Sequence, residues 1–123
     1  MITINVQENE AWDRLSILEI KKFFSNTVEQ RIELKKQIIE LQEQINIAIT
    51  YNKAVQIYSS EIYTELYNVN FKLFEYFNEL KNKDLSGIIG DKLNYERHLI
   101  KNKLQETYFN NKNKEIKIGY KNE

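Results

Sequence analysis

Three polar residues occupy positions where the spacing of a helix calls for apolar side chains. Arg97 interrupts a stripe of aliphatic residues, and Asn70 interrupts an aromatic row. Glu19 falls between Trp12 and Phe23 in the same way. Burying a charge destabilises a fold by several kcal/mol unless a partner neutralises it. Because the three residues lie on different predicted helices, we expect Glu19, Asn70 and Arg97 to meet one another in the core.

Such a cluster has two possible chemical roles, and the sequence leaves both open. In the first, Arg97 forms a bidentate pair with Glu19, and the buried polar groups fix helix register and oligomeric state. In the second, Arg97 donates hydrogen bonds to a carboxylate or phosphate of a ligand, with Arg14 or Lys101 at the rim and Trp12 as one wall. We favour the structural lock, because chemistry of the chorismate-mutase type needs several convergent cations and the chain has three arginines.

Two pairs of acidic residues have a spacing that can bind a metal ion. Residues 10–13 read E-x-x-D and residues 40–43 read E-x-x-E, which resembles the magnesium-binding pairs of all-α nucleotide pyrophosphohydrolases. In that family the E-x-x-E comes first, whereas here the order is reversed. Lys36 lies one turn before Glu40, which is typical of a solvated helix face. We therefore predict no metal site and no cofactor.

The remaining candidates for chemistry are single residues or short motifs. His98 is the only histidine, and no catalytic triad can be built around it, so an exposed helix residue is predicted. Two glycines in the segment 87–90 are too few to indicate a phosphate-binding loop. The aromatic row recurs at core spacing, which favours packing over base stacking on nucleic acid. That row consists of Tyr63, Tyr67, Phe74 and Phe77.

Composition and charge argue against several classes of protein. Eighteen basic side chains balance eighteen acidic ones, so the net charge does not predict binding to nucleic acid or to an anionic membrane. The first twenty residues are mostly acidic and residues 101–121 are rich in lysine, so a weak attraction between the two ends is expected. The chain has no cysteine, no apolar run of about 20 residues and no signal-like N-terminus. We predict one cytoplasmic domain over residues 1–123.

Helical periodicity dominates the chain, which contains no proline and three glycines, all after residue 86. Asn9 is the predicted N-cap of the first helix, and Thr27 followed by Gln30 predicts a capping box for the second. Alternating apolar residues predict a strand near each end. We expect an all-α fold, an antiparallel four-helix bundle with a short strand at each terminus. The helices are predicted over residues 10–24, 28–52, 60–82 and 88–109, the strands over 2–6 and 115–120, and a polar linker over 110–114.

The third predicted helix has an apolar face that is too wide for one neighbouring helix to cover. A stripe of aliphatic residues adjoins the aromatic row around Asn70. This helix is therefore expected either to be central in the bundle or to form part of a dimer seam. The two terminal strands need support as well, from each other or from a second subunit. Self-association is predicted.

The segment from Glu10 to Lys21 reads EAWDRLSILEIK and directly follows the first predicted strand. It resembles the opening of an uncharacterised family of small helical bacterial proteins, a domain of unknown function. Arg14 stands where that family has a lysine, and Tyr95 stands where it tends to have an acidic residue. Further similarities lie at Val69-Asn70, at Asn94-Tyr95-Glu96-Arg97 leading to Lys101, and at Glu115-Ile116-Lys117 before Tyr120.

The resemblance covers nearly the whole chain, and its first motif is the specific one. It implies a helical fold and a set of residues, but no activity. Members of the family occur near genes for the assembly of surface polysaccharides, which suggests a cellular context.

The sequence thus predicts a non-catalytic interaction or accessory protein that self-associates, with a homodimer or another protein as its partner. The alternative is a small-molecule binding protein or a small enzyme centred on Arg97, with a carboxylate or phosphate as its ligand. Nucleic-acid binding through the lysine-rich end is a third, disfavoured option. The candidate polar cluster consists of Trp12, Asp13, Arg14, Glu19, Asn70, Asn94 and Arg97.

Overall fold

A computed structural model of the chain describes residues 2–109 and 115–120. The polar linker predicted at 110–114 lies outside the described residues, and so do Lys112, Lys114 and Lys121 of the lysine-rich end. The described elements are β1 (Ile2–Gln7), α1 (Glu8–Phe23), α2 (Val28–Ala48), α3 (Tyr51–Tyr58), α4 (Glu61–Glu75), the π-helix η1 (Tyr76–Leu80), α5 (Ile88–Phe109) and β2 (Glu115–Tyr120).

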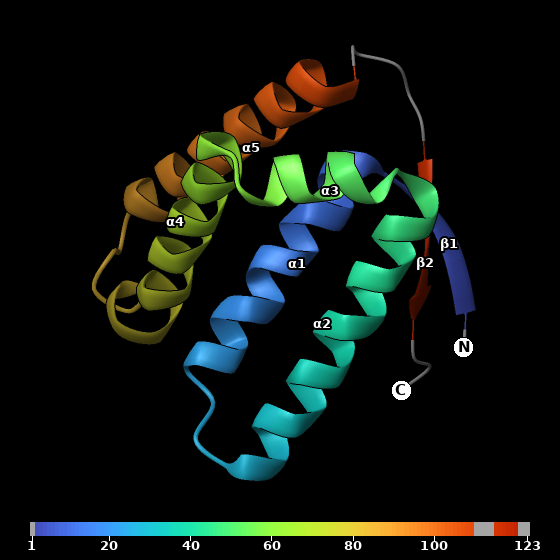
Figure 1. Cartoon of the computed structure of the whole chain (residues 1–123). Helices are drawn as coiled ribbons and strands as arrows, with labels where there is room; N and C mark the ends of the chain where they lie inside the picture. Colours follow the sequence, from blue (N-terminus) through green and yellow to red (C-terminus); the bar gives the residue numbers. More distant parts are fainter. Residues whose placement is uncertain (1, 110–114, 121–123) are drawn as a thin grey trace.

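α1 lies at the centre of the helical part of the molecule (Figure 1). α2 packs along one side of it, while α4 and α5 pack against each other and against α1. The short α3 crosses near one end of α1 and leads the chain from α2 to α4. The all-α class is confirmed, but the prediction of four helices was wrong, because five α-helices are present in the described residues. Fully buried aliphatic side chains of this core are Leu15, Ile45, Ile57, Leu66 and Leu104.

The additional helix arises from a break in the helix predicted over residues 28–52. Ile49 and Thr50 are both extended, and Thr50 Oγ1 accepts a hydrogen bond from the backbone N–H of Lys53 at 3.3 Å. Threonine is a good N-cap and a poor interior helix residue, so the chain ends one helix and starts another here. The turn that results places Ala54 and Ile57 in the core. No proline or glycine marks the break, which is why the helix predicted over residues 28–52 continues past it.

α1 begins two residues earlier than predicted, and Asn9 is not its N-cap. The N-cap position belongs to Gln7, whose side chain makes no capping hydrogen bond. Asn9 is buried in the first turn, where its backbone N–H donates to Gln105 Oε1 at 3.1 Å and its side-chain amide donates to the Lys101 carbonyl at 3.2 Å. A free N–H at the start of α1 is thus satisfied by α5 rather than by a local cap.

The predicted N-cap of α2 is confirmed. Thr27 Oγ1 accepts from the backbone N–H of Gln30 at 3.1 Å. The Gln30 side chain reaches back to the backbone N–H of Asn26 at 3.1 Å, one residue earlier than a capping box requires. Ser60 Oγ caps α4 by accepting from the backbone N–H of Tyr63 at 3.2 Å.

The start of α5 is organised by Asp84. Its Oδ2 accepts from the backbone N–H groups of Ile89 at 3.0 Å and Gly90 at 3.3 Å, and from the Tyr76 hydroxyl at 3.0 Å. Burial opposes the charge of this carboxylate, but the hydrogen bonds prevail and lower the pKa of Asp84. The N–H groups that a phosphate would use at this helix start are therefore occupied by a side chain of the protein itself.

The alternating segments at the two ends of the chain form β1 and β2. They pair antiparallel, with a register that runs from Ile2 opposite Tyr120 to Gln7 opposite Glu115 (Figure 1). β2 also lies against α2. None of the helices within the described residues is both long enough and apolar enough to cross a membrane.

Candidate functional site

Asp13 of α1 is the centre of the polar cluster. Its carboxylate is 1 % exposed and receives both arms of the Arg97 guanidinium from α5. Arg97 Nε donates to Asp13 Oδ1 at 3.1 Å, and Arg97 Nη2 donates to Asp13 Oδ2. This is the bidentate fork that makes arginine–carboxylate pairs stronger than single hydrogen bonds. The hydrogen bond to Asp13 raises the pKa of Arg97, so the guanidinium stays charged.

Asn70 of α4 joins a further helix to this pair. Its side-chain amide donates to Asp13 Oδ1 and to Ser16 Oγ, each at 2.8 Å. Ser16 Oγ in turn donates to the backbone carbonyl of Asp13 at 2.7 Å. We call Asp13, Ser16, Asn70 and Arg97 the Asp13 network, and it connects α1, α4 and α5. Every member of this network except Arg97 is buried.

A second ion pair lies beside the Asp13 network. Lys101, one turn after Arg97 on α5, forms an ion pair with Glu10, and its Nζ lies 4.0 Å from Asp13 Oδ2. Two cations of α5 thus meet two carboxylates of α1, and the formal charges cancel. The acidic pair at residues 10–13, which resembled a metal site, is used here for two salt bridges. Within the described part of the chain, no three His, Cys, Asp or Glu side chains are grouped to hold a metal ion.

Glu19 does not occupy the place predicted for it. Its carboxylate accepts from the Tyr63 hydroxyl at 2.7 Å and from the Tyr58 hydroxyl at 3.1 Å, so it links α1 to α3 and α4. The prediction that Glu19 pairs with Arg97 was therefore wrong. Six residues separate Glu19 from Asp13, which turns the two side chains about 120° apart on the helix. The apolar spacing marked Asn70 and Arg97 correctly, but it did not identify their acidic partner.

The two tyrosines remain hydrogen-bond donors to Glu19. Burial raises the pKa of Tyr63 well above its ordinary value, and the hydrogen bond to the Glu19 carboxylate is the next largest cause. Burial, and after it the negative charge of Glu19, raise the pKa of Tyr58. Neither hydroxyl is poised to lose its proton near neutral pH, so both remain donors that link α3 and α4 to Glu19 of α1.

The other predicted members of the cluster are dispersed. Trp12 packs edge-on against Tyr63, with ring centroids 5.6 Å apart, and faces α2 and α3 rather than the Asp13 network. Arg14 is half-buried on α1, and Asn94 is exposed on α5, one turn before Arg97. The structure shows no bond between Asn94 and the Asp13 network.

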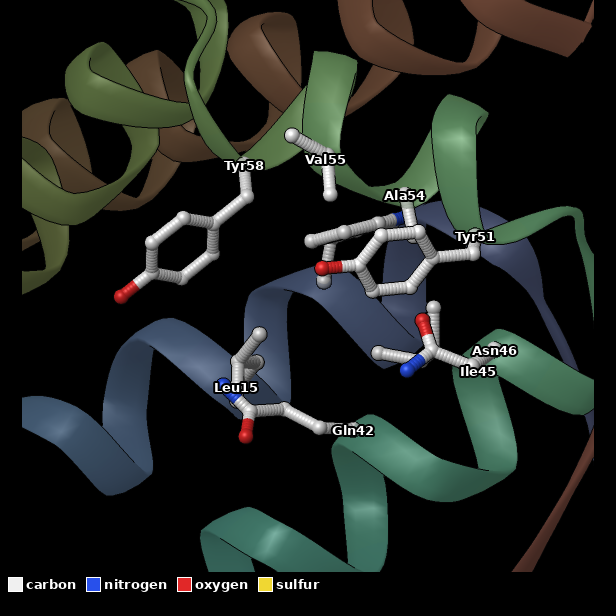
Figure 2. Close-up of a pocket in the computed structure, with 9 residues that line it drawn as sticks. Leu15, Gln42, Ile45, Asn46, Tyr51, Ala54, Val55 and Tyr58 are labelled. Atoms are coloured by element: carbon white, nitrogen blue, oxygen red, sulfur yellow. The ribbon is translucent and has the colours of Figure 1, made fainter.

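A pocket that the sequence did not reveal lies between α1, α2 and α3. It has a volume of about 280 Å³ and is lined by nine side chains, among them Trp12, Gln42, Asn46, Tyr51 and Tyr58 (Figure 2). Its third wall is α3, a helix that the sequence did not predict as a separate element. The capping potential of Thr50 was the one signal in the sequence that could have exposed this wall.

A group of phenylalanines forms a surface cluster where the end of α1 meets α4. Phe24 stacks on Phe74 with ring centroids 4.7 Å apart, and it contacts Phe23 and Phe71, each at 5.1 Å. Phe23 is nevertheless 69 % exposed. We call Phe23, Phe24, Phe71 and Phe74 the phenylalanine cluster. The predicted core row is only partly confirmed, because Tyr63 is buried whereas Phe77 is 53 % exposed.

The candidate functional regions of the molecule are the Asp13 network, the phenylalanine cluster and the pocket beside Trp12. Comparison with known proteins adds no precedent for any of them, since no family model, no curated protein and no solved structure matches the chain.

Proposed function

We propose that this chain is a non-catalytic interaction or accessory protein, with the Asp13 network as a structural lock. The observation that supports this role is the saturation of the Asp13 carboxylate. Oδ1 accepts from Arg97 and Asn70, and Oδ2 accepts from Arg97. A carboxylate held in this way has no oxygen directed at a substrate. The arrangement is suited to fixing how α1, α4 and α5 pack.

The alternative role, an anion site at Arg97, has less support. The Nε and Nη2 groups of Arg97 are both engaged by Asp13, and Lys101 is paired with Glu10. A carboxylate or phosphate ligand that bound these same donors would have to displace the buried carboxylate of Asp13. Since the partner left behind would then be an uncompensated buried charge, such an exchange is unfavourable.

The proposed interaction is self-association through the phenylalanine cluster. Exposed groups of large apolar side chains mark interaction surfaces, and aromatic rings are enriched at the centres of such surfaces. A second copy of the chain is the partner that we propose, because equal numbers of acidic and basic side chains leave no net repulsion between copies. Membership of the family that residues 10–21 resemble is a separate proposal, and it is compatible with an accessory role.

Self-association is tested by measuring the molar mass of the purified protein over a range of concentrations by light scattering. We expect wild-type protein to reach twice the mass of one chain, and Phe23→Ser to shift the equilibrium towards the monomer. Leu85→Ser is the matched control, because Leu85 is a fully exposed apolar residue between η1 and α5. A wild-type protein that is monomeric throughout, or a Phe23→Ser variant that dimerises like wild type, contradicts the proposal.

A further inference from the structure

The pocket between α1, α2 and α3 is a second candidate site, independent of the Asp13 network. Its volume of about 280 Å³ is near the lower end of the sizes found for small-molecule sites, about 300–1,000 Å³. α1 supplies Trp12, α2 supplies Gln42 and Asn46, and α3 supplies Tyr51 and Tyr58. Three helices therefore converge on one space that can hold a ligand of metabolite size.

The lining of this pocket carries no formal charge. All nine residues are apolar, aromatic or amide-bearing, with neither a lysine or arginine nor an aspartate or glutamate among them. A charged group inside the pocket would lose its hydration and meet no counter-ion, which is costly. The part of a ligand that enters is therefore uncharged.

Aromatic rings give the pocket a preference for flat ligands. Figure 2 shows the rings of Tyr51 and Tyr58 extending from α3 opposite the side chains of Gln42 and Asn46 on α2. Tyr51 is 68 % exposed, whereas Tyr58 is 44 % exposed and stacks on Tyr63 with ring centroids 5.2 Å apart, so Tyr51 offers the more open ring surface at the rim. Flat heterocycles stack on such rings with little dependence on their substituents.

Two amide groups stand opposite those rings. Gln42 and Asn46 are four residues apart on α2, which places them on the same face of the helix, one turn from each other. Each amide offers both donors and an acceptor. This is the combination that pairs with the mixed donor and acceptor edge of a nucleobase, as asparagine and glutamine do with adenine.

Trp12 of the same wall carries a buried donor without a partner. The residue is 2 % exposed, and its indole Nε1 has no hydrogen-bond partner among the described residues. A buried donor without a partner costs about 1–3 kcal/mol. The indole is therefore held in place by packing rather than by hydrogen bonds.

We propose that this pocket binds the uncharged heterocycle of a small purine or pyrimidine compound, stacked on the tyrosines of α3 and hydrogen-bonded by Gln42 and Asn46. This binding role is additional to self-association and does not depend on the phenylalanine cluster.

Trp12 is the only tryptophan in the chain, so its fluorescence and its single indole N–H resonance report on this pocket alone. The full-length protein is titrated with adenosine and with uridine. We expect a saturable change in tryptophan emission and a shift of the indole N–H resonance with at least one of the two. No change in either signal at millimolar concentrations of both nucleosides, with a folded protein, overturns the proposal.

Variants locate the binding and separate it from a folding defect. Asn46→Leu is expected to weaken nucleoside binding by about tenfold or more, the loss of roughly one hydrogen-bonded contact. Ala54→Leu, which adds bulk to the lining of the pocket, is expected to abolish binding while the helical circular dichroism is retained. Asn94→Leu, which removes an exposed amide on α5, is the control and should bind like wild type. If Asn46→Leu binds like wild type, the assignment fails.

Two further ligands test the chemical class. Adenosine monophosphate should bind no more tightly than adenosine, because no cation lines the pocket, and tighter binding of the nucleotide contradicts an uncharged site. Glucose is uncharged and of similar size but is not flat, and it should give no signal. Binding of glucose without binding of either nucleoside overturns the assignment to heterocycles.

Discussion

At the scale of single residues, Asp13 connects three helices. It is fully buried, carries a charge and is bonded to residues of α4 and α5. Replacing a buried ion pair by apolar residues can be neutral, but removing one partner leaves the other uncompensated. Replacing one member of the Asp13–Arg97 pair should therefore destabilise the fold more than replacing both with apolar residues. A double-mutant cycle measures this difference as a coupling free energy.

Asp13→Asn is expected to lower the free energy of unfolding by about 3 kcal/mol, because Arg97 loses its counter-ion. Arg97→Met should also be destabilising, and the double variant should lose less than the sum of the single changes. Urea denaturation followed by circular dichroism measures all three. Lys103→Met is the control, since the Lys103–Glu65 pair is exposed and should contribute less than about 0.5 kcal/mol. Additive effects of Asp13→Asn and Arg97→Met would contradict the structural lock.

Tyr63 is expected to make the stability of the protein fall at alkaline pH. Burial and the bond to Glu19 raise its pKa in the folded state, whereas the unfolded chain releases this proton near pH 10. The folded state then binds more protons than the unfolded state, so stability is complete below about pH 10 and falls as the pH rises further. Tyr63→Phe should make this fall shallower in urea midpoints measured between pH 8 and 11. Tyr95→Phe, at an exposed position, should leave the slope as in wild type.

At the scale of elements, short polar contacts decide where helices begin. Thr50 separates α3 from α2, and Asp84 caps α5. Both events are local in the chain, yet both set tertiary geometry: the first creates a wall of the pocket, and the second holds η1 against the start of α5. Helix propensity alone would have continued the first helix through Thr50.

Gly90 illustrates the same conflict between propensity and packing. A Cβ at this position would lie 2.7 Å from a ring carbon of Tyr76, which is buried and bonded to Asp84. Gly90→Ala is therefore expected to destabilise the protein by about 1–3 kcal/mol, the usual cost of overpacking. Helix propensity alone predicts a gain of about 1 kcal/mol. Thermal unfolding decides between the two, with Lys92→Ala on the exposed face of α5 as the control.

At the scale of the whole molecule, α1 has different partners on its different faces. One face carries Asp13 towards α4 and α5, and another carries Trp12 towards α2 and α3. The proposed lock, the proposed pocket and the phenylalanine cluster at the end of α1 are thus organised around a single helix. Phe23→Ser should shift the monomer–dimer equilibrium without changing nucleoside binding. Asn46→Leu should weaken nucleoside binding without changing the monomer–dimer equilibrium.

The amino-acid sequence was enough to predict the helical class, the strands at the two ends, the cap at Thr27 and the unusual positions of Asn70 and Arg97. Each of these follows from periodicity or from hydrogen bonds between near neighbours. Only the tertiary structure decided that Asp13 rather than Glu19 meets Arg97, that Asn9 is bonded to α5, and that a pocket lies beside Trp12. The physical reason is that periodicity fixes which side chains share a face, whereas the helix that each face meets depends on packing between residues distant in sequence.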